Sequence, residues 1–557
     1  MFEKNQLTVG RYLFNCLNSE GISEIFGVPG DYNFTLLDNL EKDERINFVG
    51  CRNELNAGYA ADAYARIKGL SVMITTFGVG ELNACNAIAG AYSEYVPIVH
   101  IVGAPKTMVQ MEHRKMHHTL MNGDYSVYEN IYKNITAYTA VITKDNAQIE
   151  IPTAIKIAKE MKRPVYLVIA IDVVDQPVTK REINLLKPQT NQNSLQLALD
   201  NIKQVINRAQ KPVLLPDIMV SRYNLQSVVE SLADKMDIPV ATMMAGKGSF
   251  NESHKNYIGL YAGRWGSLEV KDFVEGCDCI LAVGPIWSDY NTGSFSAQLN
   301  PVNIIEIQPN YVKVGMSLYE NVLMEDLLNE LVKIVEKKSV PIPNIKRIYN
   351  ENNNINGNDQ ITSVYYYPKL QNFIKENDIV IVESGSLPLG MAEVRLPKSV
   401  TYICQYNWGS IGYATPAAFG ACVADRNRRI VLFTGDGSIH LTAQELSSII
   451  YNGCKPVIFL INNKYYTIEA YLNAPKTTEY NNIPVWDFQK LIEAFGGNAY
   501  TARVNTNEEL DKAIEEIEIQ GKDKMCFIEI NADKMDVPEI VHNVHTMIEE
   551  MEKQKMN

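Results

Sequence analysis

The sequence has 557 residues, a net charge of −13, a hydrophobic content of 46% and a charged content of 21%. A chain of this length can form three or four domains with large cores, and its composition is that of a soluble globular protein. The acidic balance argues against nucleic acid or an anionic membrane as a partner, and no apolar run is long enough to span a bilayer.

The nine cysteines are scattered and form neither a zinc motif nor a Cys-x-x-Cys pair. Six lie among apolar or small residues and are expected to be reduced core residues: Cys51, Cys85, Cys404, Cys422, Cys454 and Cys526. The first ten residues have no signal-peptide pattern. A reducing, cytoplasmic location is therefore predicted.

The first predicted unit, residues 1–185, alternates short apolar strands with helices. Asp31 lies in a turn that follows the strand predicted over 24–28, and Glu54 begins an Ala-rich helix predicted over 54–67. A negative charge at the start of a helix, such as Glu54, also stabilises the helix dipole. The position of Glu54 alone therefore does not distinguish a structural role from a catalytic one. The stretch Gly78-Val79-Gly80 lacks the third glycine of a dinucleotide-binding fingerprint, which excludes that reading.

Three of the eight histidines, His113, His117 and His118, fall within six positions of a polar loop in this unit. No carboxylate pattern accompanies them that would suit a metal site. Proton transfer is therefore the better functional interpretation.

A linker over 176–188 leads to a second unit, residues 190–340, with strands predicted near 212–215, 239–242, 279–283 and 302–307. It carries no phosphate-binding signature. A stretch rich in Asn, Pro and charge, 341–360, precedes a third unit, residues 360–557. The repeated strand–helix alternation predicts three consecutive α/β domains with mostly parallel sheets.

The third unit contains an apolar strand over 430–433 that leads into Gly435-Asp436-Gly437. A helical pattern over 441–451 and a second apolar strand over 456–461 follow, and the second strand delivers Asn462 and Asn463. A carboxylate and an amide at neighbouring strand ends suit Mg²⁺ that is completed by diphosphate oxygens. Gly-Asp-Gly alone is commonly a tight turn, but the full strand–helix–strand arrangement is much more specific.

Seven motifs extend this pattern over essentially the whole chain: Phe26–Asn33, Asn53–Asp62, Thr75–Leu82, His117–Leu120, Trp408–Gly412, Gly435–Gly437 and Thr467–Glu469. Together they resemble those of the thiamine diphosphate-dependent 2-oxo acid decarboxylases, the pyruvate and indolepyruvate decarboxylase group. The resemblance implies a pyrimidine-binding domain, a central domain and a diphosphate-binding domain. It also implies bound thiamine diphosphate and Mg²⁺, held between the subunits of a homodimer that commonly pairs into a dimer of dimers.

The implied reaction is non-oxidative decarboxylation of a 2-oxo acid to the aldehyde and CO₂, through a cofactor ylide and an enamine. By resemblance, the catalytic residues are Asp31, Glu54, His117, His118 and Glu469. The residues implied to bind the cofactor are Glu54, Ser384, Ser386, Gly409, Ile411, Gly435, Asp436, Gly437, Ser438 and Asn463. The implied metal ligands are Asp436, Asn463 and the carbonyl group of Tyr465, and the implied substrate pocket contains Tyr290, Pro388, Ile468 and Leu472.

The chain departs from the family pattern at Lys464-Tyr465, where an acidic residue and Gly are usual. If residue 465 needs a positive φ, Tyr is strained there, and an adjusted backbone is expected. The bulk of Tyr290, Ile468 and Leu472 favours pyruvate or a short aliphatic 2-oxo acid, whereas Leu387-Pro388-Leu389 leaves more room. Two alternatives stay open, an acetolactate synthase-like carboligase and a catalytically degenerate binding paralogue.

Overall fold

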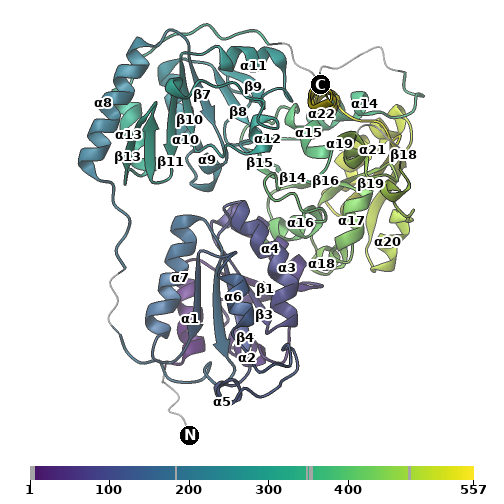
Figure 1. Ribbon diagram of the computed structural model, residues 1–557. Coiled ribbons are helices and arrows are strands. Elements are labelled where there is room, and N and C mark those ends of the chain that lie inside the picture. Colours follow the sequence, from purple (N-terminus) through teal and green to yellow (C-terminus); the bar gives the residue numbers. More distant parts are fainter. Residues whose placement is uncertain (1–6, 182–184, 346–348, 350–355, 474–477, 557) are drawn as a thin grey trace.

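The computed structural model describes residues 7–181, 185–345, 349, 356–473 and 478–556, which form three α/β domains, each around one sheet (Figure 1). Apolar strand sequences are buried on both faces, as the completely buried strand β17 (Val457–Asn462) illustrates. Parallel sheets require such cover because their crossover helices lie on the two faces. The predicted class, three consecutive α/β domains with mostly parallel sheets, is confirmed.

The first sheet is entirely parallel and has the strand order β2-β1-β3-β4-β6-β5. Its strands are β1 (Glu24–Gly27), β2 (Asn47–Gly50), β3 (Ser71–Thr76), β4 (Ile98–Ala104), β5 (Tyr138–Ile142) and β6 (Val165–Ala170). Its helices are α1 (Val9–Ser19), α2 (Phe34–Glu41), α3 (Glu54–Lys68), α4 (Val79–Ser93), α5 (Thr107–Met111), α6 (Val127–Tyr132) and α7 (Ala147–Met161). This domain lies at the bottom of Figure 1.

The second sheet is mixed and has the order β13-β12-β11-β10-β7-β8-β9. Its strands are β7 (Pro212–Pro216), β8 (Val240–Met243), β9 (Tyr257–Tyr261), β10 (Cys279–Val283), β11 (Ile304–Gln308), β12 (Tyr311–Val314) and β13 (Ser317–Glu320). Its helices are α8 (Gln192–Arg208), α9 (Ile218–Arg222), α10 (Gln226–Met236), α11 (Leu268–Glu275), α12 (Asp289–Thr292) and α13 (Met324–Ile334), with the 3₁₀ turn η1 (Pro301–Asn303). Strands β12 and β13 form an antiparallel edge that the sequence did not indicate, and β9 was also not predicted.

The third sheet is again entirely parallel, in the order β15-β14-β16-β17-β19-β18. Besides β17, its strands are β14 (Ile379–Val382), β15 (Thr401–Ile403), β16 (Ile430–Gly435), β18 (Ala499–Val504) and β19 (Met525–Asn531). Its helices are α14 (Ser363–Phe373), α15 (Leu387–Ala392), α16 (Ala414–Ala424), α17 (Asp436–Thr442), α18 (Glu445–Tyr451), α19 (Thr467–Leu472), α20 (Phe488–Ala494), α21 (Asn507–Gln520) and α22 (Glu539–Met556), with η2 (Glu479–Asn481). The single helix predicted over 441–451 is therefore wrong, because two short helices occupy 436–451 and the first begins directly at Asp436.

The first and third domains share one topology. When the strands of each are counted along the chain, both sheets have the order 2-1-3-4-6-5. Helices α3 and α16 occupy equivalent places after the second strand, and they pack on each other between the two domains (Figure 1). Their contact is close because small residues line it: a Cβ atom at Gly420 would lie 1.9 Å from the carbonyl oxygen of Ala60.

Cys422, in α16, and Cys454 form a disulfide with Cα atoms 6.1 Å apart, so the expectation that both are reduced is wrong. They are 32 residues apart, and only the packing of α16 beside the loop after α18 brings them together. The other seven cysteines are free. No helix within the described ranges is both long and apolar enough to cross a membrane.

Candidate active site

The predicted site residues lie at equivalent strand ends of the two outer domains. In the first domain, Asp31 follows β1, Glu54 follows β2, and His117 and His118 follow β4. In the third, the equivalent connections carry Ser384 and Ser386, then Gly409 and Ile411, then Asn463 and Glu469. Asp436 follows β16, which corresponds to β3. Ligands bind at this carboxyl edge in parallel α/β sheets.

Asp31, His117 and His118 form a cluster in which one ligand-type atom of each lies within 4.8 Å of the others. The Nε2 atom of His117 is 2.5 Å from Oδ2 of Asp31, and Nε2 of His118 is 3.5 Å from Oδ1. The Tyr32 ring stacks on His117 with ring centroids 5.1 Å apart. All three side chains of the cluster are partly exposed, so a substrate could exchange protons with them.

Glu54 is the first residue of α3, and the Asn53 side chain caps the helix by accepting the N–H of Asn56. The Oε2 atom of Glu54 accepts a hydrogen bond from Nδ2 of Asn83, 2.7 Å away. Gly80 lies against the same carboxylate, because a Cβ atom there would be 3.1 Å from Oε1 of Glu54. The carboxylate is therefore held at the end of a buried helix while part of it stays exposed.

Asp436 forms the centre of the candidate metal site. Its Oδ1 atom accepts the N–H of Gly437 at 2.9 Å, and its Oδ2 atom accepts the N–H of Lys464 at 2.6 Å. Burial raises the pKa of Asp436 to about 6, although these backbone donors lower it. The structure shows no ion pair between Asp436 and a cationic side chain of the described residues, and a buried carboxylate of this kind suits a divalent cation, which would restore the charge balance.

Asn463 and Tyr465 lie beside this carboxylate. The Oδ1 atom of Asn463 accepts the Tyr465 N–H at 3.1 Å, and its Nδ2 donates to Oγ1 of Thr467 at 2.7 Å. The left-handed residue of the departing stretch is Lys464, with φ +59°, while Tyr465 is outside the positive-φ region. The positive φ therefore occurs one residue before Tyr465. The backbone of Tyr465 is unstrained, and its carbonyl group could bind a metal.

The surroundings fit a bound cofactor. The hydroxyl of Ser384 is buried and has no hydrogen-bond partner among the described residues, so it is available to a ligand. Cβ atoms at Gly409 or Gly435 would meet no other heavy atom within 4 Å, so both backbones face open space. Gly409 has φ +65°, which also explains why glycine occurs there. Ser386 precedes α15, Ile411 lies two residues beyond Gly409, and Ser438 is buried in the first turn of α17.

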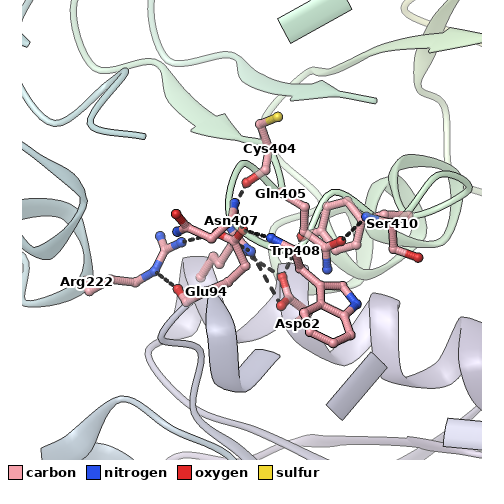
Figure 2. Close-up of polar contacts among 10 residues, drawn as sticks. Asp62, Glu94, Arg222, Cys404, Gln405, Asn407, Trp408 and Ser410 are labelled. Atoms are coloured by element: carbon pink, nitrogen blue, oxygen red, sulfur yellow. Dashed lines mark hydrogen bonds and ion pairs between the residues drawn. The ribbon is translucent and has the colours of Figure 1, made fainter. Parts of the chain in front are cut away.

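The loop that carries Gly409 and Ile411 is fixed by buried charges of the other two domains (Figure 2). Arg66 binds Asp62 at 2.6 Å and the Cys404 carbonyl oxygen at 3.0 Å. Oε1 of Glu94 accepts the N–H groups of Asn407 and Trp408, at 2.6 and 3.1 Å. Arg222 of the second domain donates to the Glu94 carbonyl oxygen at 2.9 Å. All three domains therefore contribute to the position of this loop.

The predicted substrate-pocket residues lie on the second and third domains. The Tyr290 ring packs against Trp265 and Tyr406, with centroids 5.4 and 6.0 Å away. Burial, with the nearby charges of Cys404, Asp289 and Glu469, raises the pKa of Tyr290 to about 12. Ile468 is partly buried beside exposed Glu469, Pro388 is buried in α15, and Leu472 is 43% exposed.

The structure assembles the site in two separate halves. Among the residues that the structure describes, no hydrogen bond, ion pair or ring contact joins Asp31, Glu54, His117 or His118 to Asp436, Asn463 or Glu469. The half on the first domain has Asp31, Glu54, His117 and His118, whereas the half on the third domain has Glu469 and the candidate metal ligands.

The sequence interpretation missed two buried acids near these halves. Glu383 directly follows β14 and accepts the N–H groups of Ser384 and Ala414, and burial raises its pKa to about 7. Glu81 follows the Gly78-Val79-Gly80 turn, and burial raises its pKa to about 7 as well. The available signal was an acid directly after a completely apolar strand at Glu383, and an acid directly after a glycine-rich turn at Glu81.

Comparison with known proteins agrees with this arrangement. Three family descriptions match the chain: "Thiamine pyrophosphate enzyme, N-terminal TPP binding domain" over residues 7–125, the central domain of the same enzymes over 199–327, and their C-terminal TPP binding domain over 383–530. The chain is 39% identical to a pyruvate decarboxylase of Aspergillus fumigatus over 547 residues, which cover 96% of each chain. It is 38% identical to pyruvate decarboxylase isozyme 3 of Saccharomyces cerevisiae and to a pyruvate decarboxylase of Kluyveromyces lactis, over 96% of this chain and 97% of theirs. The chain belongs to the thiamine diphosphate-dependent 2-oxo acid decarboxylase family.

Proposed function

We propose that this enzyme converts a 2-oxo acid, with pyruvate or another short aliphatic acid preferred, to the aldehyde and CO₂. The observation that carries the proposal is the cluster of Asp31, His117 and His118, which supplies adjacent proton donors and acceptors. A decarboxylase must protonate the carbon that loses CO₂ before the aldehyde leaves, and a carboxylate–imidazole cluster suits that task.

Bound thiamine diphosphate would supply the electron sink that accepts the electrons released with CO₂. Glu54 would hydrogen-bond the pyrimidine ring, while the carbonyl group of Gly409 and the N–H of Ile411 would hold its amino group. Asp436, Asn463 and the Tyr465 carbonyl group would bind Mg²⁺, and the serine hydroxyls would face the diphosphate. Asp31, His117, His118 and Glu469 would move protons at the substrate.

The two halves of the site would meet across a homodimer. Support comes from the single chain, in which Glu54 makes a hydrogen bond to Asn83 and Asp436 makes hydrogen bonds to Gly437 and Lys464, each within its own domain. If each site takes one half from each subunit, mixing Glu54→Gln and Asp436→Asn chains creates dimers with one intact site. About a quarter of wild-type activity should return on co-expression, because half of the dimers are mixed and each has one of two sites intact. No recovery would contradict a shared site.

Pairing of dimers into a tetramer is the further expectation, and light scattering would test it.

The substrate preference rests on Tyr290, Ile468 and Leu472, which would narrow the pocket, while buried Pro388 would leave space at the other side. The test is a panel of 2-oxo acids of increasing chain length, with the aldehyde measured through alcohol dehydrogenase and NADH. Release of free acetaldehyde from pyruvate supports a decarboxylase, whereas acetolactate as the main product would identify a carboligase.

A degenerate binding protein is the other alternative, and the occurrence of Lys464 and Tyr465 where an acidic residue and Gly are usual is the feature that favours it. Titration of the apoprotein with thiamine diphosphate and Mg²⁺ tests the enzyme hypothesis, because a protein that binds neither could not catalyse the proposed reaction.

A cytoplasmic location is proposed from the seven free thiols, although the Cys422–Cys454 disulfide is unusual for a reducing compartment.

A further inference from the structure

The turn between β3 and α4 contacts both functional groups of the first domain. Gly78 has φ +66°, and a Cβ atom on it would lie 1.8 Å from the carbonyl oxygen of His118. Two residues later, Gly80 lies against the carboxylate of Glu54. The position of this one turn therefore affects Glu54 and His118 together.

Glu81 holds the turn from inside the domain. Its Oε1 atom accepts the N–H of Gly78, the N-cap residue of α4, at 2.6 Å and so satisfies a donor at the start of that helix. Its Oε2 atom accepts the hydroxyl of Tyr166, and its own carbonyl oxygen accepts the hydroxyl of Tyr132 at 2.5 Å. The two tyrosine rings stack with centroids 4.3 Å apart, so the carboxylate is anchored to a rigid aromatic pair.

Burial of the Glu81 carboxylate costs desolvation free energy, which a helix cap alone does not require. The side chain is completely buried, and desolvation raises its pKa to about 7 although the hydrogen bonds from Tyr166 and Gly78 lower it. The adjacent His100 ring packs on both tyrosines and makes its polar contact with Thr75, not with Glu81. A helix start can be capped by an exposed acid at no such cost, as Glu509 does at α21.

His118 also needs support, because it is a non-glycine residue with φ +61°. Such a backbone persists only where its surroundings hold it. Gly78 lies under the His118 carbonyl group, and the hydroxyl of Tyr128 donates to the same oxygen at 3.3 Å.

We propose that Glu81 is a positioning residue for the decarboxylation site: through the N–H of Gly78 it fixes the turn that places Glu54 and His118. This inference rests on the proposed roles of those two residues. Glu81 contacts neither of them, so its effect must pass through the turn.

The test compares Glu81→Ala with Glu81→Gln, which keeps an oxygen that can accept the Gly78 N–H. Glu509→Ala is the matched control, because it removes an exposed acid that caps the start of α21 in the third domain. Two readouts are used: amide hydrogen exchange of peptides spanning 77–82 and 115–121 in the apoprotein, and kcat and KM with pyruvate at equal folded fractions. Glu54→Gln is assayed alongside.

Glu81→Ala should speed exchange in both peptides and lower kcat on the order of a hundredfold with little change in KM, because a small displacement of reacting groups has that effect. Glu81→Gln should restore most of kcat, and Glu509→Ala should change neither readout. Unchanged exchange at 115–121, or a kcat equal to that of Glu509→Ala, would overturn the proposal. If Glu81→Ala is insoluble, Tyr166→Phe replaces it, and unchanged exchange and kcat in that variant overturn the proposal equally. Wild-type activity in Glu54→Gln would instead refute the proposed function of Glu54.

Discussion

Replacement of Arg66 by Met should expose how strongly the buried charges hold the three domains together. The guanidinium binds Asp62 at 2.6 Å, lies 3.7 Å from Glu94 and donates to the Cys404 carbonyl oxygen at 3.0 Å, and the Arg66 and Asp62 side chains are 4% and 1% exposed. Removal of one partner of a buried ion pair costs about 3–5 kcal/mol, because the other charge stays buried without compensation. Arg222 remains 3.8 Å from Glu94 and compensates that carboxylate in part, so the expected loss is near the lower end, about 3 kcal/mol.

The assay is the urea midpoint of the first unfolding transition, since a chain of three domains need not unfold in one step. Lys133→Met is the control, because it removes an exposed pair with Glu129 worth less than about 1 kcal/mol. Addition of Asp62→Asn to Arg66→Met should recover at least about 1 kcal/mol by removing the orphaned charge. A loss no larger than that of Lys133→Met, or strict additivity in the double variant, would refute the reasoning.

Three further outcomes are expected. Gly78→Ala should lower kcat on the order of a hundredfold in folded enzyme, because its Cβ atom would displace His118; a wild-type kcat would mean that this contact has no catalytic effect. The folded-state pKa of Glu81, about 7, exceeds its ordinary value of 4.5, so its contribution to stability is complete below pH 4.5 and is lost as the pH rises through 7. The loss is at most about 3 kcal/mol; urea midpoints between pH 5 and 8 should therefore fall less in Glu81→Gln than in the wild type, and equal slopes would contradict this. Asp436→Asn should weaken Mg²⁺ binding more than about tenfold by calorimetry with thiamine diphosphate present, and unchanged affinity would exclude Asp436 as a ligand.

Much of the fold could be predicted because its signals are local. Apolar runs such as 430–433 mark buried strands, and helix α3 begins at Glu54 as the Ala-rich pattern predicted. The antiparallel strands β12 and β13 escaped prediction because they are four residues long and only partly buried. The Cys422–Cys454 disulfide escaped because it depends on packing between distant segments.

The candidate site also combines features with a local sequence signal and features that depend on distant segments. The types of residue that do the chemistry were visible as motifs, whereas the groups that hold them were not. Arg66 and Cys404 are 338 positions apart, and neither has a neighbour in sequence that announces the hydrogen bond between them. The backbone at Tyr465 is adjusted as expected: the positive φ is at Lys464, whose N–H donates to Asp436, and Tyr465 is outside the positive-φ region.

Helix α3 has a consequence for how this protein tolerates change. Every residue from Asn56 to Ala65 is buried, Gly58 lies against Ala87 of α4, and Ala60 lies against Gly420 of α16. An added methyl group at Gly58 would push α3 and α4 apart within the first domain, and one at Gly420 would push α3 away from α16 of the third domain. In a library of single substitutions, α3 should therefore be among the segments with the fewest surviving variants. Variants that replace its small residues should be as rare among the survivors as variants that replace Glu54, even though none of these small residues takes part in the chemistry.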